Sequence, residues 1–277
     1  MKILHPTDFS RTAEHARTLA LDLSDRLGAT LHVVYVQEKF MEGSGEHTYL
    51  LGRAENLSSE LLKRLEESRE EEVKHIRQRL ERLTPEGSSS ELRWGKTVPE
   101  LLELSKQHDL IVMGAHGANR LDNYFLGGTA GRIARRSNTP ILSVRDEAET
   151  TSVRRILVAT DFGTASRNAW EFARSLAEHS AEHSIEIAVA HVTTDPDTSD
   201  AVTELDAFTG DADVRKVIRA GNPVDALPNI AREIGADVIA IGIWRHAGPL
   251  GLVLGSQADA LLRSSPVPIL SVPGSSS

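Results

Sequence analysis

The stretch of the sequence best suited to binding a phosphate is rich in glycine. Gly114 ends a short apolar run, Gly117 follows after two residues, and Gly127, Gly128 and Thr129 come just before a helical pattern. Glycines let the backbone approach a ligand and turn its N–H groups toward it, and the positive end of a helix dipole favours an anion. The alternative is an ordinary strand-to-helix loop, because short glycine spacings are common.

A carboxylate near the start of the chain is the second group that could bind a ligand. Asp8 follows an apolar strand pattern at 2–4, and Gly114 follows another at 110–113. In a parallel sheet, ligands sit beyond the carboxyl ends of the strands, near the switch in strand order. There Asp8 could accept a hydrogen bond from a ribose hydroxyl or a base amine. It could equally be a neighbour of a helix N-cap with no ligand role.

Strands alternating with helices must position these residues. In the first part of the chain, strands are expected at 2–4, 30–36, 91–94, 110–113 and 140–144, and helices at 13–27, 54–83, 98–107 and 130–136. This alternation predicts a parallel sheet covered on both faces, with right-handed crossovers. The helix at 54–83 is mostly charged, so we expect it to be the least stable of these elements. We also expect it to cover the ligand side of the sheet or to form a homodimer contact.

The pattern then starts again. Asp161 lies 153 positions after Asp8, whereas Gly242 lies 128 positions after Gly114, so the second copy is 25 residues shorter. The loss falls where the first copy has its long charged helix, and a polar linker separates the copies. We therefore predict an α/β protein of two tandem domains, 1–146 and 153–277. Each domain is expected to be an open parallel five-stranded sheet with helices on both faces.

The last strand of the first copy, Pro140–Val144, is repeated letter for letter as Pro268–Val272. Apolar strands at a sheet edge are normally paired or covered. We therefore predict that these two strands pair and that the domains form an internal pseudo-dimer.

The composition excludes several classes of partner. The chain has 31 basic and 40 acidic residues, a formal net charge of -9 and no cysteine. An acidic chain without a basic stripe is not expected to bind nucleic acid or an anionic membrane. No apolar run approaches the roughly 20 residues that span a bilayer, and the N-terminus has no secretory h-region. These observations predict a cytoplasmic protein without a membrane partner.

Three of these features together resemble the universal stress proteins, in their tandem, ATP-binding form. The resemblance rests on the segment 3–10 (ILHPTDFS), on Tyr35 and Val36, and on Gly114-x-x-Gly117 followed by Gly127. It implies the adenine nucleotide α-hydrolase-like fold, with ATP or another adenine nucleotide bound in the first domain, with or without Mg²⁺. It also implies a regulatory role in the stress response through an unidentified protein partner.

The resemblance assigns roles to individual residues of the first domain. Asp8 would bind the adenosine part, Val36 would meet adenine through its backbone, and the glycines would line the phosphates. The residues expected at the nucleotide are Pro6, Asp8, Val36, Met113, Gly114, Gly117, Gly127, Gly128 and Thr129. ATP-binding members have Ser or Thr after the third glycine. Here Gly128 takes that place, so the phosphate-facing hydroxyl is lost unless Thr129 supplies it.

The second domain departs from the pattern at one position. Asp161, Val192, Gly242, Gly255 and Ser256 occupy the expected places, but Arg245 replaces the middle glycine. If that position needs a positive φ, a non-glycine residue is strained there, and the side chain would fill the phosphate space. A guanidinium could instead contact a phosphate. On the backbone argument we expect a degenerate site.

Three functions are compatible with these residues: a nucleotide-binding regulatory protein, a slow ATPase, and a scaffold that has lost the site. The chain lacks a Walker lysine motif, which argues against a fast P-loop ATPase. The first-domain glycines favour the two nucleotide-binding functions. No catalytic base is evident, which favours the regulatory protein over the ATPase.

Overall fold

The computed structural model describes residues 1–38, 59–115, 128–145, 148, 150–180, 184–195, 197–248 and 251–274. The predicted site residues Gly117 and Gly127 lie outside these ranges, as does the segment 54–58 of the predicted long helix.

The first half of the chain follows the predicted order of strands and helices. Its elements are β1 (Lys2–Pro6), α1 (Arg11–Leu27), β2 (Thr30–Gln37), α3 (Ser59–Leu83), β3 (Ser89–Trp94), α4 (Thr97–Ser105), β4 (Leu110–Gly114), α5 (Thr129–Arg136) and β5 (Ile141–Val144). Ser10 caps the start of helix α1, because its side chain accepts a hydrogen bond from the N–H of Ala13. Gly28, in the left-handed conformation, caps its end. These are the start and stop that helix capping favours.

The second half repeats this order, and its described residues include a hairpin between β9 and α9. Its elements are β6 (Arg155–Thr160), α6 (Thr164–His179), β7 (Glu186–Thr193), α7 (Ser199–Thr209), β8 (Arg215–Ala220), α8 (Pro223–Ile234), β9 (Val238–Ile243), β10 (Arg245–Gly248), β11 (Gly251–Leu254), α9 (Ser256–Ser264) and β12 (Ile269–Pro273). Helix α7 stands where the first half has the longer α3. The second copy therefore keeps a shorter helix at the place where the sequence shows its deletion.

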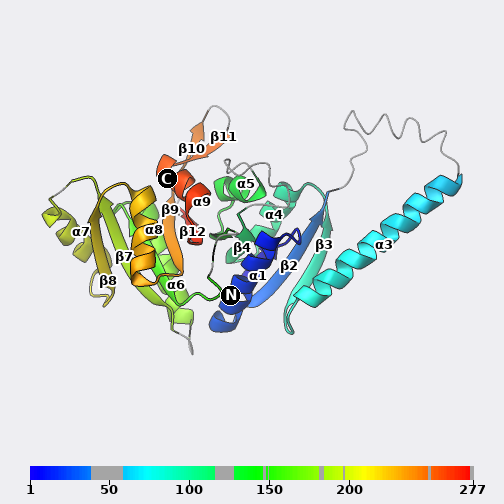
Figure 1. Ribbon diagram of the computed structural model, residues 1–277, viewed down its shortest axis with the longest axis horizontal. Coiled ribbons are helices and arrows are strands. Elements are labelled where there is room, and N and C mark those ends of the chain that lie inside the picture. The colour runs from blue at the N-terminus through cyan, green and yellow to red at the C-terminus, as the bar shows by residue number, and fades with distance from the viewer. Residues whose placement is uncertain are drawn as a thin grey trace.

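One sheet runs through both halves (Figure 1), in the order β3-β2-β1-β4-β5-β12-β9-β6-β7-β8. All pairs within each half are parallel, so each half contributes five parallel strands. In the first half the chain moves outward from β1 to β2 and β3, and then returns to place β4 on the other side of β1. This reversal creates the switch point at which open α/β sheets bind ligands.

Helices cover both faces of the sheet, and each face has its own hydrophobic core. One core packs α1, α3, α6 and α7 against the sheet, and the other packs α4, α5, α8 and α9. Successive strand residues alternate between the cores, as Ile3 and Leu4 do in β1, because side chains alternate across a strand. Both cores extend through the two halves. The predicted parallel α/β architecture is confirmed.

The two halves join through β5 and β12, which pair antiparallel in the middle of the sheet. Leu142 faces Leu270, its equivalent 128 positions later, and Ile141 faces Ser271. The pairing is thus reciprocal about Leu142, as in a contact related by a two-fold axis. All four residues of β5 are buried. The predicted pairing of these strands is confirmed.

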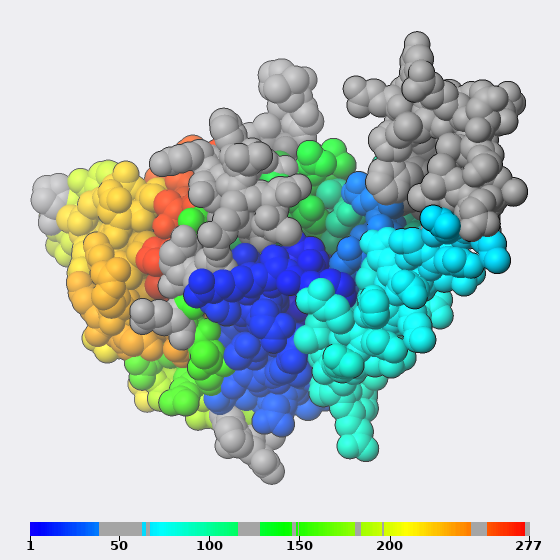
Figure 2. Space-filling view, turned by 45° about the vertical axis from the view of Figure 1, so that its right-hand side comes forward, coloured from blue at the N-terminus to red at the C-terminus, as the bar shows by residue number. Residues whose placement is uncertain are grey.

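Helix α3 reaches beyond the sheet (Figures 1 and 2), where it lies at the outer side of β3. Its residues Ile76 and Leu80 are buried, whereas its side chains at 67–72 are exposed. The helix is therefore held to the sheet mainly through its C-terminal part. No helix in the described part of the chain has the length and apolar character to cross a lipid bilayer.

Candidate ligand-binding site

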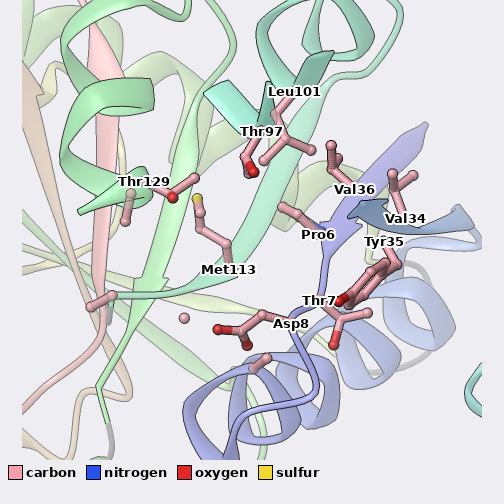
Figure 3. A pocket seen from close by; sticks show the side chains of 14 residues that line it. Pro6, Thr7, Asp8, Val34, Tyr35, Val36, Thr97, Leu101, Met113 and Thr129 are labelled. Carbon is pink, nitrogen blue, oxygen red and sulfur yellow. The ribbon is translucent and has the colours of Figure 1, made fainter. Parts of the chain in front are cut away.

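A cavity of about 180 Å³ opens at the carboxyl ends of β1, β2 and β4 in the first half. Its lining residues are Pro6, Thr7, Asp8, Ala13, Val34, Tyr35, Val36, Thr97, Leu101, Met113, Gly114, Ala115, Thr129 and Ala130 (Figure 3). Of the predicted site residues, Pro6, Asp8, Val36, Met113, Gly114 and Thr129 line this cavity. The fold thus gathers residues from positions 6 to 129 at the switch point of the sheet.

The turn after β1 fixes the position of Asp8. The N–H of Phe9 donates to Thr7 Oγ1 at 3.0 Å, and the N–H of Ser10 donates to Asp8 Oδ1 at 3.0 Å. Phe9 has a φ of 60°, in the left-handed region that a bulky residue rarely adopts. Such a conformation persists only where its surroundings enforce it. In this chain the two side-chain hydrogen bonds and an aromatic stack do so.

The stack links this turn to helix α3. The ring of Phe9 lies 4.9 Å from that of Tyr35 in a stacked arrangement, and the guanidinium of Arg79 lies 3.9 Å from the Phe9 centroid. Burial raises the pKa of Tyr35, and the nearby carboxylates of Glu72 and Asp8 raise it further. The phenol therefore stays protonated at neutral pH and can donate a hydrogen bond at the cavity. Helix α3 is thus linked to the lining residue Tyr35 through Arg79 and Phe9.

Apolar side chains form the inner wall of the cavity. Val36, Leu101 and Met113 belong to the core between the sheet and helices α4 and α5, and in Figure 3 they lie around Pro6. Beside them, the carboxylate of Glu38 accepts hydrogen bonds from the backbone N–H of Thr97 at 3.3 Å and from its hydroxyl at 2.9 Å. A mainly apolar wall with a few placed polar groups is typical of small-molecule sites.

Helix α5 points its N-terminus into the cavity. Its N-cap is Gly128, without a side-chain hydrogen bond, and Thr129 is its first residue. Helix α9 of the second half begins in the same way, with Gly255 as N-cap and Ser256 next. Aligned by their caps, Thr129 and Ser256 occupy equivalent positions. The hydroxyl that Gly128 lacks is therefore present one residue later, and Thr129 lines the cavity.

The two strand-ending glycines have a packing role of their own. A Cβ on Gly114 would lie 3.1 Å from backbone atoms at the start of α1. A Cβ on Gly242 would lie 2.1 Å from the backbone of Ala165 in α6. Gly242 thus leaves no room for a side chain beside α6, and a side chain at Gly114 would crowd the start of α1. Gly114 alone is consequently no sign of a phosphate.

A buried histidine lies directly before the site. His5 is fully buried, and its Nδ1 lies 2.9 Å from the carbonyl oxygen of Val112. Within the described residues its Nε2 has no hydrogen-bond partner. Burial lowers the pKa of His5 to about 4, because desolvation disfavours the charged imidazolium. The imidazole is therefore neutral at physiological pH.

The second half has a cavity at the equivalent edge, with a volume of about 330 Å³. It includes Asp161, Val192, Gly242, Gly255 and Ser256, the predicted counterparts of first-half site residues. Arg245 begins strand β10, which pairs with β11. Its φ angle is not positive. The expectation of backbone strain at Arg245 was therefore wrong, because the segment is an extended hairpin rather than a glycine turn.

Several lining residues of the first cavity were missed by the sequence reasoning. Tyr35 was quoted only as part of a motif, and Thr7 and Thr97 were not singled out. Thr97 follows β3 closely, so its position at the carboxyl edge of the sheet could have been inferred from the strand pattern. Of the described lining residues, Asp8 alone carries a charge. The described residues also bring together no three His, Cys, Asp or Glu side chains that could hold a metal ion.

Comparison with known proteins gives the same family across both halves. The model of the Universal stress protein family matches residues 1–145 and 152–273. A universal stress protein of Methanocaldococcus jannaschii is 28% identical over 156 residues, which cover 52% of this chain and 94% of that protein. A universal stress protein of Mycobacterium tuberculosis H37Rv is 22% identical over 204 residues, which cover 65% of this chain and 67% of that protein.

A solved structure shares the whole architecture. The crystal structure of a universal stress protein from Archaeoglobus fulgidus matches with a TM-score of 0.69 and 23% identity, and the match covers 98% of both chains. At this identity the likeness concerns the fold, including its tandem arrangement.

Proposed function

This chain belongs to the universal stress protein family, and on that basis we propose that it is a regulatory protein that binds ATP or another adenine nucleotide in its first half. The observation that carries the proposal is the cavity at the switch point of the first half. It brings a carboxylate, an apolar wall and a helix N-terminus together. These are the three kinds of group that a base, a ribose and a phosphate chain require.

Each part of the nucleotide has a matching group. The apolar side chains of Val36 and Met113 suit the adenine ring, and the backbone of Val36 can contact its edge. Asp8 accepts from ribose hydroxyls. Thr129 and the first N–H groups of α5 bind phosphate, because that helix has no acidic residue in its first turn to oppose an anion. Gly114, Gly117, Gly127 and Gly128 complete the proposed phosphate loop, in which Gly117 and Gly127 lie outside the described residues.

Magnesium, if it accompanies ATP, is expected to bind through the phosphates and water. Mg²⁺ commonly keeps several waters and takes few protein ligands. The described residues supply no three-residue metal cluster that would suggest a dedicated site.

The charge of the cavity favours binding over rapid catalysis. Phosphoryl transfer needs cationic groups or metal ions to stabilise the charge that develops in the transition state. The described lining contains one charged residue, Asp8, which is an anion. The slow ATPase and the nucleotide-free scaffold remain the alternatives to be separated by experiment.

The two domains, 1–146 and 153–277, are proposed to act as an internal pseudo-dimer. The reciprocal pairing of β5 with β12 supports this arrangement. Nucleotide binding would then bias the surface that this cytoplasmic protein offers to a protein partner in the stress response. Helix α3 is a candidate part of that surface, because Arg79 contacts Phe9, which stacks on the lining residue Tyr35, and because the helix extends beyond the sheet.

The test is to identify the ligand that the protein carries. The full chain is purified gently and denatured, and the released small molecules are quantified by mass spectrometry, with Asp8→Asn treated in parallel. ATP recovered from the wild type, and much less from the variant, supports the regulatory protein. ADP formed from added ATP at a rate that Asp8→Asn reduces supports the slow ATPase. Recovery of no nucleotide, with no binding of added ATP, supports the scaffold and contradicts the proposal.

A further inference from the structure

We propose that the second-half cavity binds a nucleoside through its base and ribose, without a contribution from a phosphate chain. The choice of adenosine as the probe rests on the proposed function of the first half. The cavity itself is observed independently, and its volume of about 330 Å³ lies within the range typical of small-molecule sites.

An exposed tryptophan marks the rim of this cavity. Trp244 is 39% exposed and lines the cavity just after β9. One edge of its ring rests on Gly274, where an added Cβ would lie 3.4 Å from Trp244 Cε3. The N–H of Gly274 in turn donates to the carbonyl of Ile243 at 2.9 Å. The indole is thus supported from one side while it remains accessible, an arrangement suited to stacking on a planar heterocycle.

A carboxylate at the same cavity is held ready for hydroxyl groups. Asp161 Oδ1 accepts from the N–H of Gly163 at 3.0 Å and from Ser166 Oγ at 2.7 Å. Both bonds fall on Oδ1, and neither uses Oδ2. Ser166 has no counterpart in the first half, where Ala13 stands 153 positions earlier. The second-half carboxylate is therefore held by the hydroxyl of a serine that the first half replaces with alanine, and such preorganisation favours binding of a ligand diol.

The backbone that would have bound phosphates is used for another purpose. Between β9 and α9 the chain forms the β10–β11 hairpin, in which Arg245 pairs with Leu254 and Ala247 with Leu252. Main-chain groups that pair with each other across a hairpin are not available to cradle a phosphate chain. The segment that carries arginine in place of the middle glycine thus has its main chain paired within the hairpin.

The helix that follows is also less suited to an anion than its first-half equivalent. Helix α9 carries Asp259 in its first turn, whereas α5 has no acidic residue there. The carboxylate of Asp259 lies 3.1 Å from Arg135 and also pairs with Arg263. A carboxylate already occupies the favourable field of this helix end. The base and ribose contacts therefore remain, whereas a phosphate would meet only Ser256 and the N-terminus of α9, close to this carboxylate.

The experiment is isothermal titration calorimetry of the full chain with adenosine and with ATP. In the Asp8→Asn background, which weakens the first site about tenfold or more, adenosine should bind at the second cavity with a stoichiometry near one, and ATP should bind at that cavity no more than about threefold tighter than adenosine. Adding Trp244→Ala should weaken adenosine binding about tenfold or more, since stacking on an aromatic contributes about 1–3 kcal/mol per base. The matched control Trp244→Phe, which keeps an aromatic ring, should stay within about threefold. Circular dichroism and thermal melting verify that each variant is folded.

Three results would overturn the inference: no adenosine binding in Asp8→Asn, unchanged binding after Trp244→Ala, or ATP binding at least tenfold tighter than adenosine in Asp8→Asn. Failure of the proposed function looks different. In that case the wild type binds ATP no better than Asp8→Asn does, whatever adenosine does at the second cavity.

Discussion

At the residue scale, Thr129 is expected to supply the hydroxyl that Gly128 lacks. Thr129 and Ser256 each follow a glycine N-cap, so they form a matched pair. Thr129→Ala should weaken ATP binding about tenfold or more, because a hydrogen bond to a charged group contributes about 1.5–3 kcal/mol. Ser256→Ala should leave ATP binding unchanged. Calorimetry of the two variants checks this, and equal effects of both substitutions would contradict the assignment.

The buried His5 predicts an acid-sensitive stability. Its pKa is about 4 in the folded chain, against an unperturbed value of 6.5. Between these values the unfolded chain binds a proton that the folded chain does not. His5 therefore lowers the free energy of unfolding as the pH falls from 6.5 toward 4, and it has little effect above 6.5. Between pH 7 and pH 5 its share of the loss is roughly 2 kcal/mol.

The variant His5→Val removes this titration and introduces the residue found at the equivalent position, Val158. Urea unfolding at pH 7 and pH 5 measures the difference in unfolding free energy for both proteins. The variant should lose roughly 2 kcal/mol less than the wild type over this interval. If the unfolding free energy falls equally in the two proteins, the folded chain does not lower the pKa of His5, which would contradict the prediction.

Residue types predicted which part of the first site is polar and which is apolar, but they did not predict its full lining. Asp8 and Gly114 follow apolar strands, so their edge of the sheet was evident. The sequence suggested a phosphate role for Gly114, which stays a prediction, but it did not reveal that Gly114 also packs closely against the start of α1. Contacts between a strand and a helix on its face depend on how closely the two approach, and a single sequence does not reveal that distance.

At the element scale, helix α3 is expected to differ in stability along its length. Ile76 and Leu80 are buried against the sheet, while the side chains at 67–72 are exposed. Amide hydrogens at 63–72 should therefore exchange faster than those at 76–83, and both faster than those of β4. Hydrogen exchange followed by mass spectrometry tests this order. Protection at 63–72 equal to that of β4 would indicate that another surface covers the helix.

The strands and most helices were predictable because hydrophobic periodicity and capping residues mark them locally. The β10–β11 hairpin was not predicted, since the repeat suggested the same loop in both copies. A hairpin of four residues per strand has too few positions for an alternating pattern to be recognised. At the place of α7 the sequence left a helix or a loop open, because the second copy is 25 residues shorter there than the first.

At the scale of the whole molecule, pairing of β5 with β12 covers an edge that each half would otherwise expose. Residues 1–145 expressed alone should therefore form a homodimer through β5, with Leu142 facing Leu142 of the second copy. This expectation follows because β5 and β12 have the same sequence and pair reciprocally about Leu142 and Leu270. Light scattering after size-exclusion chromatography gives the mass, and a monomer at micromolar concentration would contradict it.

The central claim is that each chain binds one adenine nucleotide tightly, in the first half. The most direct measurement is calorimetry of the full chain with ATP, using Asp8→Asn and its repeat equivalent Asp161→Asn as a matched pair. We predict one tight site per chain, which Asp8→Asn weakens about tenfold or more and Asp161→Asn leaves intact. Two equal sites, loss of the tight site in Asp161→Asn, or full ATP binding by Asp8→Asn would contradict the account.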